Sequence, residues 1–296
     1  TTNILTFAPP GGGKSVLIST LILAAIFDPV LEGLPKIAAI DIGNSSKGVI
    51  NLLREISPPD MRDRFMHVEF ELNERFGINV MDTRVGCQKP TSAERGFLTN
   101  FLTLVLTPVG STEPIQDATQ IATMLIDELY TVCAEDNPTK YIDGQDKLTT
   151  AWLQNQRDFE VNKSTTWWQV VYFAMSKKAY DVAGSAQRFA VPSLKMMPSR
   201  LAMSDSLKTL YGQDNPILVD AKRLILGFIQ QYPSLCKPSN FNFQETDVCI
   251  IDLNKVTQDT GPEGTRRTTI AYMVSRYLLG KDFLTNKDIL NEMPPV

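Results

Sequence analysis

The residues of this sequence best suited to chemistry are three consecutive glycines followed by a lysine and a serine. They close the segment APPGGGKS, residues 8–15. This segment fits the pattern GxxxxGK[ST] of phosphate-binding loops, except that Ala8 takes the place of the first glycine. Glycines let a backbone curve around a phosphate with its N–H groups pointing inward. The segment therefore predicts a nucleotide site, and a glycine-rich turn without a ligand is the competing interpretation.

Each residue of this loop has an expected role. Lys14 would contact the β- and γ-phosphates and is a candidate catalytic residue, and the Ser15 hydroxyl would ligate Mg²⁺. The apolar helix predicted over residues 15–27 would direct its N-terminus at the same anion. The expected ligands are therefore ATP and Mg²⁺. The nucleotide-binding residues would be Pro9, Pro10, Gly11, Gly12, Gly13, Lys14, Ser15 and Val16.

Two aspartates that end short apolar segments are further catalytic candidates. Asp41 closes the predicted strand at residues 36–43, where it could orient water or bind Mg²⁺ through water, unless it forms only an ordinary Asx turn. Asp252 ends VCIID, which imitates the Walker B strand whose acid holds Mg²⁺. Because Leu253 follows in place of a glutamate, we favour a strand that neighbours the true Walker B strand.

The elements that must position these residues alternate between strand and helix. Such alternation, with connections of helical size, predicts a parallel α/β sheet. Apolar and alternating patterns place strands at residues 4–8, 36–43, 66–72 and 247–253, and helices at residues 15–27, 93–106 and 266–280, the last ending at Gly280.

The middle of the chain has helical periodicity and no convincing strand. One helix would start near Thr112 with Pro114 in its first turn, and another would follow Ser164. Trp167 and Trp168 are expected to pack in a core. Further helices are predicted near residues 199–211 and 216–231. We therefore expect a nucleotide-binding part over residues 1–110, an all-α insertion over 111–245, and a return to the sheet over 246–296.

Composition excludes several classes of site. The net charge is −4 and basic tracts are lacking, so a nucleic-acid footprint is not expected. His67 is the one histidine, which rules out histidine-rich metal sites, and we expect it on the surface.

Four widely spaced cysteines indicate reduced thiols and a cytoplasmic compartment. The longest apolar run, residues 16–27, is shorter than a membrane span of roughly 20 residues. The strand-like start without Met suggests a piece of a longer protein.

Several segments resemble the large ATPases of type IV secretion systems. The similarity is greatest to those of the type IVB (Dot/Icm) apparatus, the DotO/IcmB group, and their conjugative-plasmid relatives. The most discriminating segment is FGINVMDTRVGCQKPTSAERGFLTNFLTLVLTP, residues 76–108. The others are FAPPGGGKSVLISTL, DIGNSSKGVI, VCIIDLNKVT and TIAYMVSRYLLGKDF.

This resemblance implies a RecA-like P-loop NTPase domain with an inserted all-α subdomain. It implies a homo-oligomer, often a hexamer, that works with other secretion-system subunits at the cytoplasmic face of the bacterial inner membrane. ATP turnover there assists assembly of the apparatus and movement of protein or DNA substrates. It assigns phosphate binding to Gly11, Gly12, Gly13 and Lys14, and Mg²⁺ to Ser15.

The resemblance also raises a doubt about catalysis. In the family the Asp-Glu pair of Walker B lies on a strand after the one that VCIIDL resembles, and no Asp-Glu pair lies between Leu253 and Val296. We therefore expect weak ATP hydrolysis from this chain alone. Two alternatives stay open: a DNA-pumping ATPase of the conjugative coupling or FtsK-like class, and a nucleotide-dependent scaffold with little turnover.

Overall fold

The computed structural model of the chain divides into two compact units. It describes residues 6–7, 9, 11–28, 30, 32–43, 45–73, 76–212, 215–240, 246–283 and 291–292. Residues 1–71 and 242–284 form one unit, which we call the sheet unit. Residues 72–241 and 285–296 form the other, which we call the helical unit.

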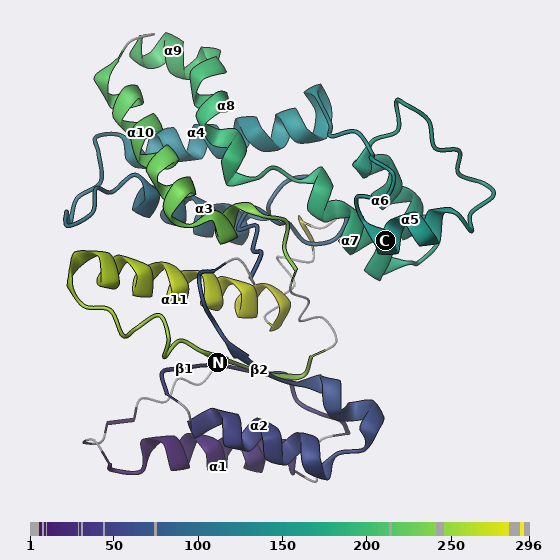
Figure 1. Cartoon of the computed structure of the whole chain (residues 1–296), viewed down its shortest axis with the longest axis vertical. Coiled ribbons are helices and arrows are strands. Elements are labelled where there is room, and N and C mark those ends of the chain that lie inside the picture. Colours follow the sequence, from purple (N-terminus) through teal and green to yellow (C-terminus); the bar gives the residue numbers. More distant parts are fainter. Residues whose placement is uncertain are drawn as a thin grey trace. The chain divides into compact units, whose positions relative to one another are not determined.

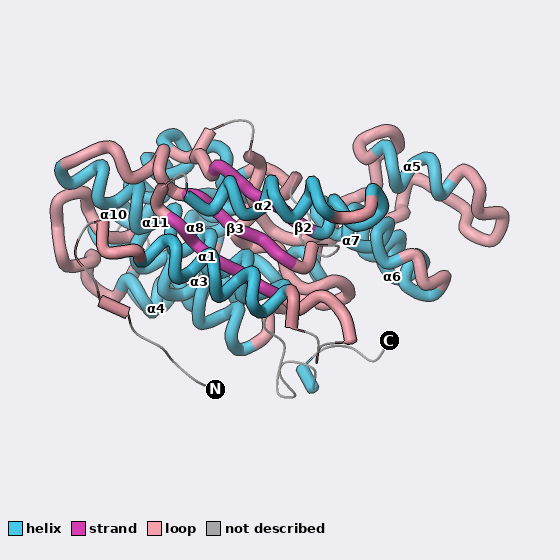
Figure 2. Tube along the Cα trace, turned by 90° about the horizontal axis from the view of Figure 1, so that it is seen from below, coloured by secondary structure: helices cyan, strands magenta, loops and turns pink. Residues whose placement is uncertain are grey.

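Three parallel strands make up the sheet (Figure 2). They are β1 (Ile37–Asp41), β2 (Phe65–Glu69) and β3 (Val248–Asp252), in the order β1-β3-β2. Every residue of β3 is buried, as its central place requires. These strands confirm three of the four predicted ones and an α/β fold with a parallel sheet. The strand predicted over residues 4–8 falls largely outside the described residues, and Thr6 and Phe7, which are described, are in no strand.

Helices cover both faces of this sheet (Figure 1). On one face lie α1 (Lys14–Ile26) and α2 (Ser45–Ile56), on the other α11 (Gly261–Phe283). A short 3-10 helix, η1 (Pro59–Arg64), leads into β2. Helix α11 is longer than predicted and does not end at Gly280, because a glycine inside a helix costs only about 1 kcal/mol, which packing can offset. None of the helices in the described ranges combines the length and apolar character that a membrane span requires.

The helical unit contains no strand among its described residues, as the sequence predicts. It has one isolated bridge, between Lys140 and Thr166. Its elements are α3 (Ser92–Val105), α4 (Ala118–Thr131), η2 (Val132–Asp136), α5 (Lys147–Leu153), α6 (Trp167–Ser176), α7 (Tyr180–Ala190), η3 (Leu194–Met196), α8 (Met197–Met203), α9 (Asp205–Tyr211), α10 (Pro216–Gln231) and η4 (Pro233–Cys236).

Two helix starts in this unit differ from the prediction. Helix α4 begins after Asp117 and not near Thr112, because the backbone N–H of Ile115 donates to Leu106 and holds the preceding residues in a turn. Helix α6 follows Thr166, whose side chain forms a capping box with Gln169, and not Ser164.

The two compact units divide near residue 71. Hydrogen bonds explain why the segment after β2 belongs with the helices. The Ile78 N–H donates to the Ser234 carbonyl at 2.9 Å, and the Gly77 N–H to the Asn240 side chain at 3.0 Å. Helix α3 then packs on α10, with the rings of Phe101 and Phe228 edge to face.

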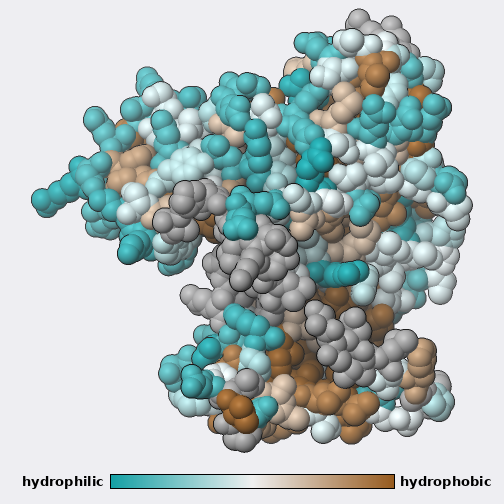
Figure 3. All heavy atoms as spheres, turned by 180° about the vertical axis from the view of Figure 1, so that it is seen from behind, coloured by the Kyte–Doolittle hydropathy of each residue, from teal (hydrophilic) through white to brown (hydrophobic). Residues whose placement is uncertain are grey.

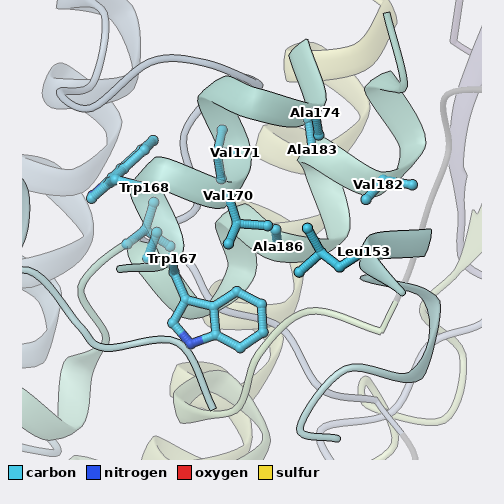
Figure 4. Close-up of a cluster of buried hydrophobic side chains, with 11 residues drawn as sticks. Leu153, Trp167, Trp168, Val170, Val171, Ala174, Val182, Ala183 and Ala186 are labelled. Atoms are coloured by element: carbon cyan, nitrogen blue, oxygen red, sulfur yellow. The ribbon is translucent and has the colours of Figure 1, made fainter. Parts of the chain in front are cut away.

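Trp167 and Trp168 are core residues, as predicted. Figure 4 shows them with side chains of α5 and α7 in a buried hydrophobic cluster. Trp167 is completely buried and its ring stacks on Phe189 at a centroid distance of 4.8 Å. These contacts fix α5, α6 and α7 as one block of the helical unit.

A buried carboxylate joins the amino ends of the three strands. Asp247, only 6% exposed, directly precedes β3. Its carboxylate pairs with Lys36, which precedes β1, at 3.2 Å and with Arg64, which precedes β2. The Lys36 ammonium also donates to the Thr246 carbonyl at 2.7 Å. One side chain therefore ties both outer strands to the central one.

We expect Asp247→Asn to destabilise the sheet unit. Removing one partner of a buried ion pair leaves the others uncompensated, at a cost of about 3–5 kcal/mol for a fully buried pair. Because Lys36 and Arg64 remain 44% and 41% exposed, we expect roughly 2–3 kcal/mol here. Urea unfolding followed by circular dichroism measures this. Asp158→Asn, which breaks the exposed pair with Lys177, is the matched control and should change the free energy of unfolding little. Equal effects of the two substitutions would contradict the role of Asp247.

Candidate functional site

The glycine loop before α1 has an open backbone. Gly11 and Gly13 have φ values of 77° and 80°, in the left-handed region that favours glycine. The Gly12 N–H donates to the Pro9 carbonyl at 2.9 Å, which turns the chain. A Cβ added at Gly11 or Gly13 would meet nothing within 4 Å. The left-handed φ values therefore favour glycine at both positions, and no described atom crowds either of them. Ala8 and Pro10 lie outside the described residues.

The loop leads into a helix whose N-cap residue, a glycine, supplies no side-chain hydrogen bond to the first turn. Gly13 occupies the N-cap position of α1, and the first turn contains no acidic residue. Helix α3, by contrast, is closed by a capping box of Thr91 and Glu94. An uncapped first turn presents N–H groups and the positive end of the helix dipole, which suits an anion. Lys14 and Ser15 are exposed in this turn.

The packing of α1 sets the direction in which this turn points. Ile22 and Ile26, in the second half of α1, pack in one cluster with Phe65 and Val248, the first residues of β2 and β3. The C-terminal half of α1 therefore covers the amino ends of the strands. The helix runs antiparallel to the strands, and its first turn lies toward their carboxyl ends, where ligands of parallel sheets bind.

Three carboxylates stand side by side at that carboxyl edge. Asp41 ends β1, Asp252 ends β3 and Glu69 ends β2, and both outer residues are in register with Asp252. Neighbouring strands lie about 4.8 Å apart, and in-register residues of parallel strands face the same side. That side is the one covered by α1 and α2, because Ile250 and Phe65, two and four positions earlier, pack there. The structure thus brings both predicted aspartates together.

Sequence reasoning missed Glu69, the third member of the row. It lies inside the alternating segment 66–72 and belongs to no motif. The signal that could have found it is positional, because a polar residue that ends a predicted parallel strand shares its edge with the ends of the other strands. Asp41 and Asp252 were found because each directly follows a buried apolar run.

Backbone groups hold the two aspartates in place. Asp252 is 3% exposed, and its Oδ1 accepts from the N–H groups of Asn254 at 2.8 Å and Gly43 at 3.4 Å. The bond to Asn254, two residues on, is an Asx turn. Asp41 Oδ1 accepts from the adjacent Ile42 N–H at 2.9 Å. Because Gly43 follows β1 and donates to a residue of β3, the loops after these two strands are joined at the edge.

Two lysines hold Glu69 in its ionised form. The Lys47 ammonium lies 2.8 Å from Oε1, and the Lys255 ammonium 3.2 Å from Oε2. Lys255 also pairs with Glu71 at 2.5 Å. Hydrogen bonds from Lys47 and then Lys255 lower the pKa of Glu69 from 4.5 to about 2. The carboxyl edge therefore carries a fixed negative group flanked by two cations.

His67 is half buried, so the expectation of a surface position was wrong. It lies on β2 two residues before Glu69, and its Nε2 atom is buried without a hydrogen bond. Desolvation lowers the pKa of His67 below 6.5, against the attraction of Asp252 and Glu69. The imidazole is therefore neutral at physiological pH.

Among the described residues, no group of three or more His, Cys, Asp or Glu side chains could hold a metal ion. Mg²⁺ commonly binds through one or two carboxylates, waters and the phosphates of a bound nucleotide. A serine hydroxyl at the start of α1 and carboxylates at the sheet edge suit that mode. The residues present therefore fit Mg²⁺ as a companion of phosphate and not as an ion held by protein alone.

Helix α1 buries only one side. Ile22 is buried, whereas Val16, Leu17, Ile18 and Leu21 are exposed, Val16 by 70%. Figure 3 shows hydrophobic residues gathered over this part of the sheet unit. A helix that is apolar all round normally lies in a core. The expected nucleotide contact Val16 therefore lies on an uncovered face of α1.

We expect the Glu69 carboxyl to titrate near pH 2 in the intact chain. Removing both cations, in Lys47→Ala/Lys255→Ala, should return its midpoint toward 4.5. Because the folded pKa lies below the unfolded one, the stabilisation is complete above about pH 4.5 and is lost as the pH falls toward 2. Carbon-detected NMR of the glutamate side chains measures this, with Lys163→Ala as the control that should leave Glu69 unchanged. A wild-type midpoint near 4.5 would contradict the stabilisation of ionised Glu69 by Lys47 and Lys255.

Comparison with known proteins gave no match, whether to a protein-family model, to a curated protein or to a solved structure. A function for this chain therefore has to follow from the chemistry of its own residues. That chemistry is an open glycine loop, an uncapped helix N-terminus and an edge of three in-register carboxylates with two lysines.

Proposed function

We propose that the sheet unit binds ATP with Mg²⁺ as a RecA-like P-loop NTPase domain. The observation that carries the proposal is the loop with left-handed Gly11 and Gly13, which leads into the uncapped first turn of α1. The residues of the phosphate-binding pattern have the left-handed glycine conformation and open space beside them. They also lead into a helix N-terminus, which attracts anions.

The proposed roles are those expected of the phosphate-binding pattern and of carboxylates at the ends of parallel strands. The loop N–H groups and the Lys14 ammonium would bind the phosphates and neutralise the charge that develops during transfer. Ser15 would hold Mg²⁺, with Asp252 or Asp41 orienting its waters from the sheet edge. Bound Mg²⁺ supplies charge that draws electron density from the phosphate oxygens. Glu69, kept ionised by Lys47 and Lys255, adds an acceptor that can orient a water on the same edge.

We further propose that this domain serves as a motor or assembly ATPase of a type IV secretion apparatus, most similar to type IVB. The support is the resemblance of the loop, of the segment at residues 76–108 and of VCIIDLNKVT to that family. A sheet unit interrupted in sequence by a helical unit also agrees with it. In this role the protein is an oligomer with other secretion subunits as partners, at the cytoplasmic face of the inner membrane. ATP turnover would drive assembly and the movement of protein or DNA.

One observation favours low turnover and thus a nucleotide-dependent scaffold. Asp252 is almost fully buried with its Oδ1 in backbone hydrogen bonds, and Leu253 follows it in place of a glutamate. We expect this chain to turn over ATP more slowly than about 1 s⁻¹, the lower end of typical enzymes. A steady-state phosphate-release assay measures this. Turnover above that rate, abolished by Asp252→Asn, would instead identify VCIID as the Walker B strand.

Lys14→Ala should weaken ATP binding with and without Mg²⁺. A hydrogen bond to a charged group contributes about 1.5–3 kcal/mol, so we expect roughly 10- to 100-fold lower affinity. Ser15→Ala should weaken binding only when Mg²⁺ is present, because its hydroxyl acts through the metal. Isothermal calorimetry in Mg²⁺ or EDTA separates the two effects.

The matched control is Lys163→Ala, an exposed lysine of the helical unit, with circular dichroism to verify folding. Equal ATP affinity of the wild type and Lys14→Ala would contradict the proposal that residues 8–15 form a phosphate-binding loop. Equal loss in Lys163→Ala would show that the binding is non-specific.

A further inference from the structure

Glu69 stands near the position where the sheet unit lacks a group to activate water. The residue directly after Asp252 is Leu253, which is apolar and 1% exposed, so it cannot act as a base. Glu69 ends β2, the strand next to β3, and is in register with Asp252. In-register residues of neighbouring parallel strands lie about 4.8 Å apart and face the same side. A second carboxylate is therefore present within one strand spacing of Asp252.

Helix α2 brings a cation and a buried hydroxyl to the same end of β2. The Lys47 ammonium, in the first turn of α2, lies 2.8 Å from Glu69. Arg54, near the other end of α2, donates to the carbonyl of Phe65 at the start of β2, so the helix runs antiparallel to the strand. Ser46 is 8% exposed, and its Oγ atom is buried without a hydrogen bond. Because buried polar groups are normally satisfied by protein, water or ligand, this hydroxyl indicates a water position near the strand ends.

The first turns of α1 and α2 lie on one face of the sheet. The two helices contact each other and cover that face together (Figure 1). Helix α2 begins beside Glu69, and the packing of α1 places its first turn toward the same carboxyl edge. Helices in contact have axes about 8–10 Å apart. A phosphate chain that starts at the glycine loop can therefore extend toward Lys47.

Two lysines restrain the Glu69 carboxylate. Lys47 of α2 and Lys255 of the loop after β3 contact its two different oxygens, at 2.8 and 3.2 Å. A carboxylate held between two ammonium groups gains little from taking a proton, so it is a weak base. Both lysine side chains are about half exposed, at 52% and 49%. Exposed ion pairs contribute little, so both lysines can exchange Glu69 for a more highly charged partner.

We propose that Glu69 is the base that activates the attacking water, and that Lys47 and Lys255 withhold it until ATP is bound. This inference rests on the proposed ATP site. The γ-phosphate carries more negative charge than a carboxylate, so it draws both ammonium groups away from Glu69. The freed carboxylate then accepts a hydrogen bond from a water beside the phosphate. ADP lacks the γ-phosphate and leaves the lysines on Glu69.

The step is a hydrolysis that leaves ADP and inorganic phosphate. The water oxygen attacks the γ-phosphorus while the bond from this phosphorus to the β,γ-bridging oxygen breaks, and the electron pair of that bond stays on the oxygen of ADP. One proton of the water passes to Glu69, which then releases it to solvent. Nothing is oxidised or reduced, so no further reactant is needed.

Two variants of the whole chain separate the roles of base and lysines. Glu69→Gln, which keeps the shape of the side chain, should lower kcat for ATP hydrolysis about 100-fold, a typical contribution of a general base. It should raise the ATP affinity, because both lysines are then free for the phosphate. Lys47→Ala/Lys255→Ala should lower the ATP affinity about tenfold and leave the ADP affinity unchanged. Phosphate release and calorimetry measure these effects, with circular dichroism to verify folding.

The titration of Glu69 is a readout that needs no turnover. With Mg²⁺, the non-hydrolysable analogue that has nitrogen in place of the β,γ-bridging oxygen should raise the pKa of Glu69 from about 2 toward 4.5, because the lysines have left it. ADP should leave the pKa near 2, and carbon-detected NMR measures both. The matched control is Lys89→Ala/Lys177→Ala, which removes two exposed lysines paired with carboxylates of the helical unit. It should change neither nucleotide affinity nor kcat.

Three results would each overturn the inference: a kcat that Glu69→Gln leaves unchanged, equal losses of ATP and ADP affinity in Lys47→Ala/Lys255→Ala, and a Glu69 pKa that the analogue does not raise. Undetectable turnover by the wild type would overturn it as well. Failure of the proposed ATP site looks different, because the wild type would then bind neither nucleotide, and both proposals would fall. Lys14→Ala should weaken the binding of ATP and of ADP, unlike the removal of Lys47 and Lys255.

Discussion

The pairing of all three strands in the sheet unit depends on β3, which follows β1 and β2 by about 180 residues or more in the sequence. β3 pairs with β1 on one side and β2 on the other, so the two earlier strands are neighbours only through it. Asp247 adds an ionic link from β3 to residues that precede both partners. The register that these contacts fix is also what aligns Asp41, Asp252 and Glu69. A shift of one residue in the pairing register of β3 would turn Asp252 to the face of the sheet that α11 covers. The three carboxylates would then no longer lie in one row.

The glycine loop before α1 and the carboxyl edge of the strands are distant in the sequence, and the packing of the sheet unit brings them to the same edge. The open glycines and α1 supply groups that attract phosphate, while the strand ends supply carboxylates and paired lysines. Bringing both to one edge requires α1 to run antiparallel to the strands, which agrees with Ile22 and Ile26 lying in one cluster with Phe65 and Val248. This combination of opposite charges at one edge is what supports the proposed magnesium nucleotide.

The hydrophobic pattern of neighbouring residues predicted most helices and strands. It did not predict features that depend on contacts between residues distant in the sequence. Short apolar runs predicted β1 and β3 within two residues at either end, and helical periodicity predicted α3 and α10. The boundary near residue 71 was not predictable, because it results from hydrogen bonds between Gly77 or Ile78 and residues 234–240. Glu69 was missed and His67 was wrongly expected on the surface for the same reason: their charged neighbours include residues distant in the sequence, such as Lys47 of α2 and Asp252 of β3. The left-handed conformation of Gly11 and Gly13 is local to the backbone, so a glycine-dependent turn there could be predicted from the sequence.

The late arrival of β3 also shapes how the chain folds. A bond such as that from Gly43 to Asp252 closes a loop of 209 residues, and the entropy of that closure must be met before the sheet gains any pairing. During synthesis β1 and β2 emerge first and have no partner between them, so they present unpaired backbone edges until the helical unit has been made. High contact order of this kind slows folding and exposes apolar edges to other chains. The helical unit, built from local contacts, is expected to fold first and to bring the ends of its own segment together, which shortens the search that β3 must complete.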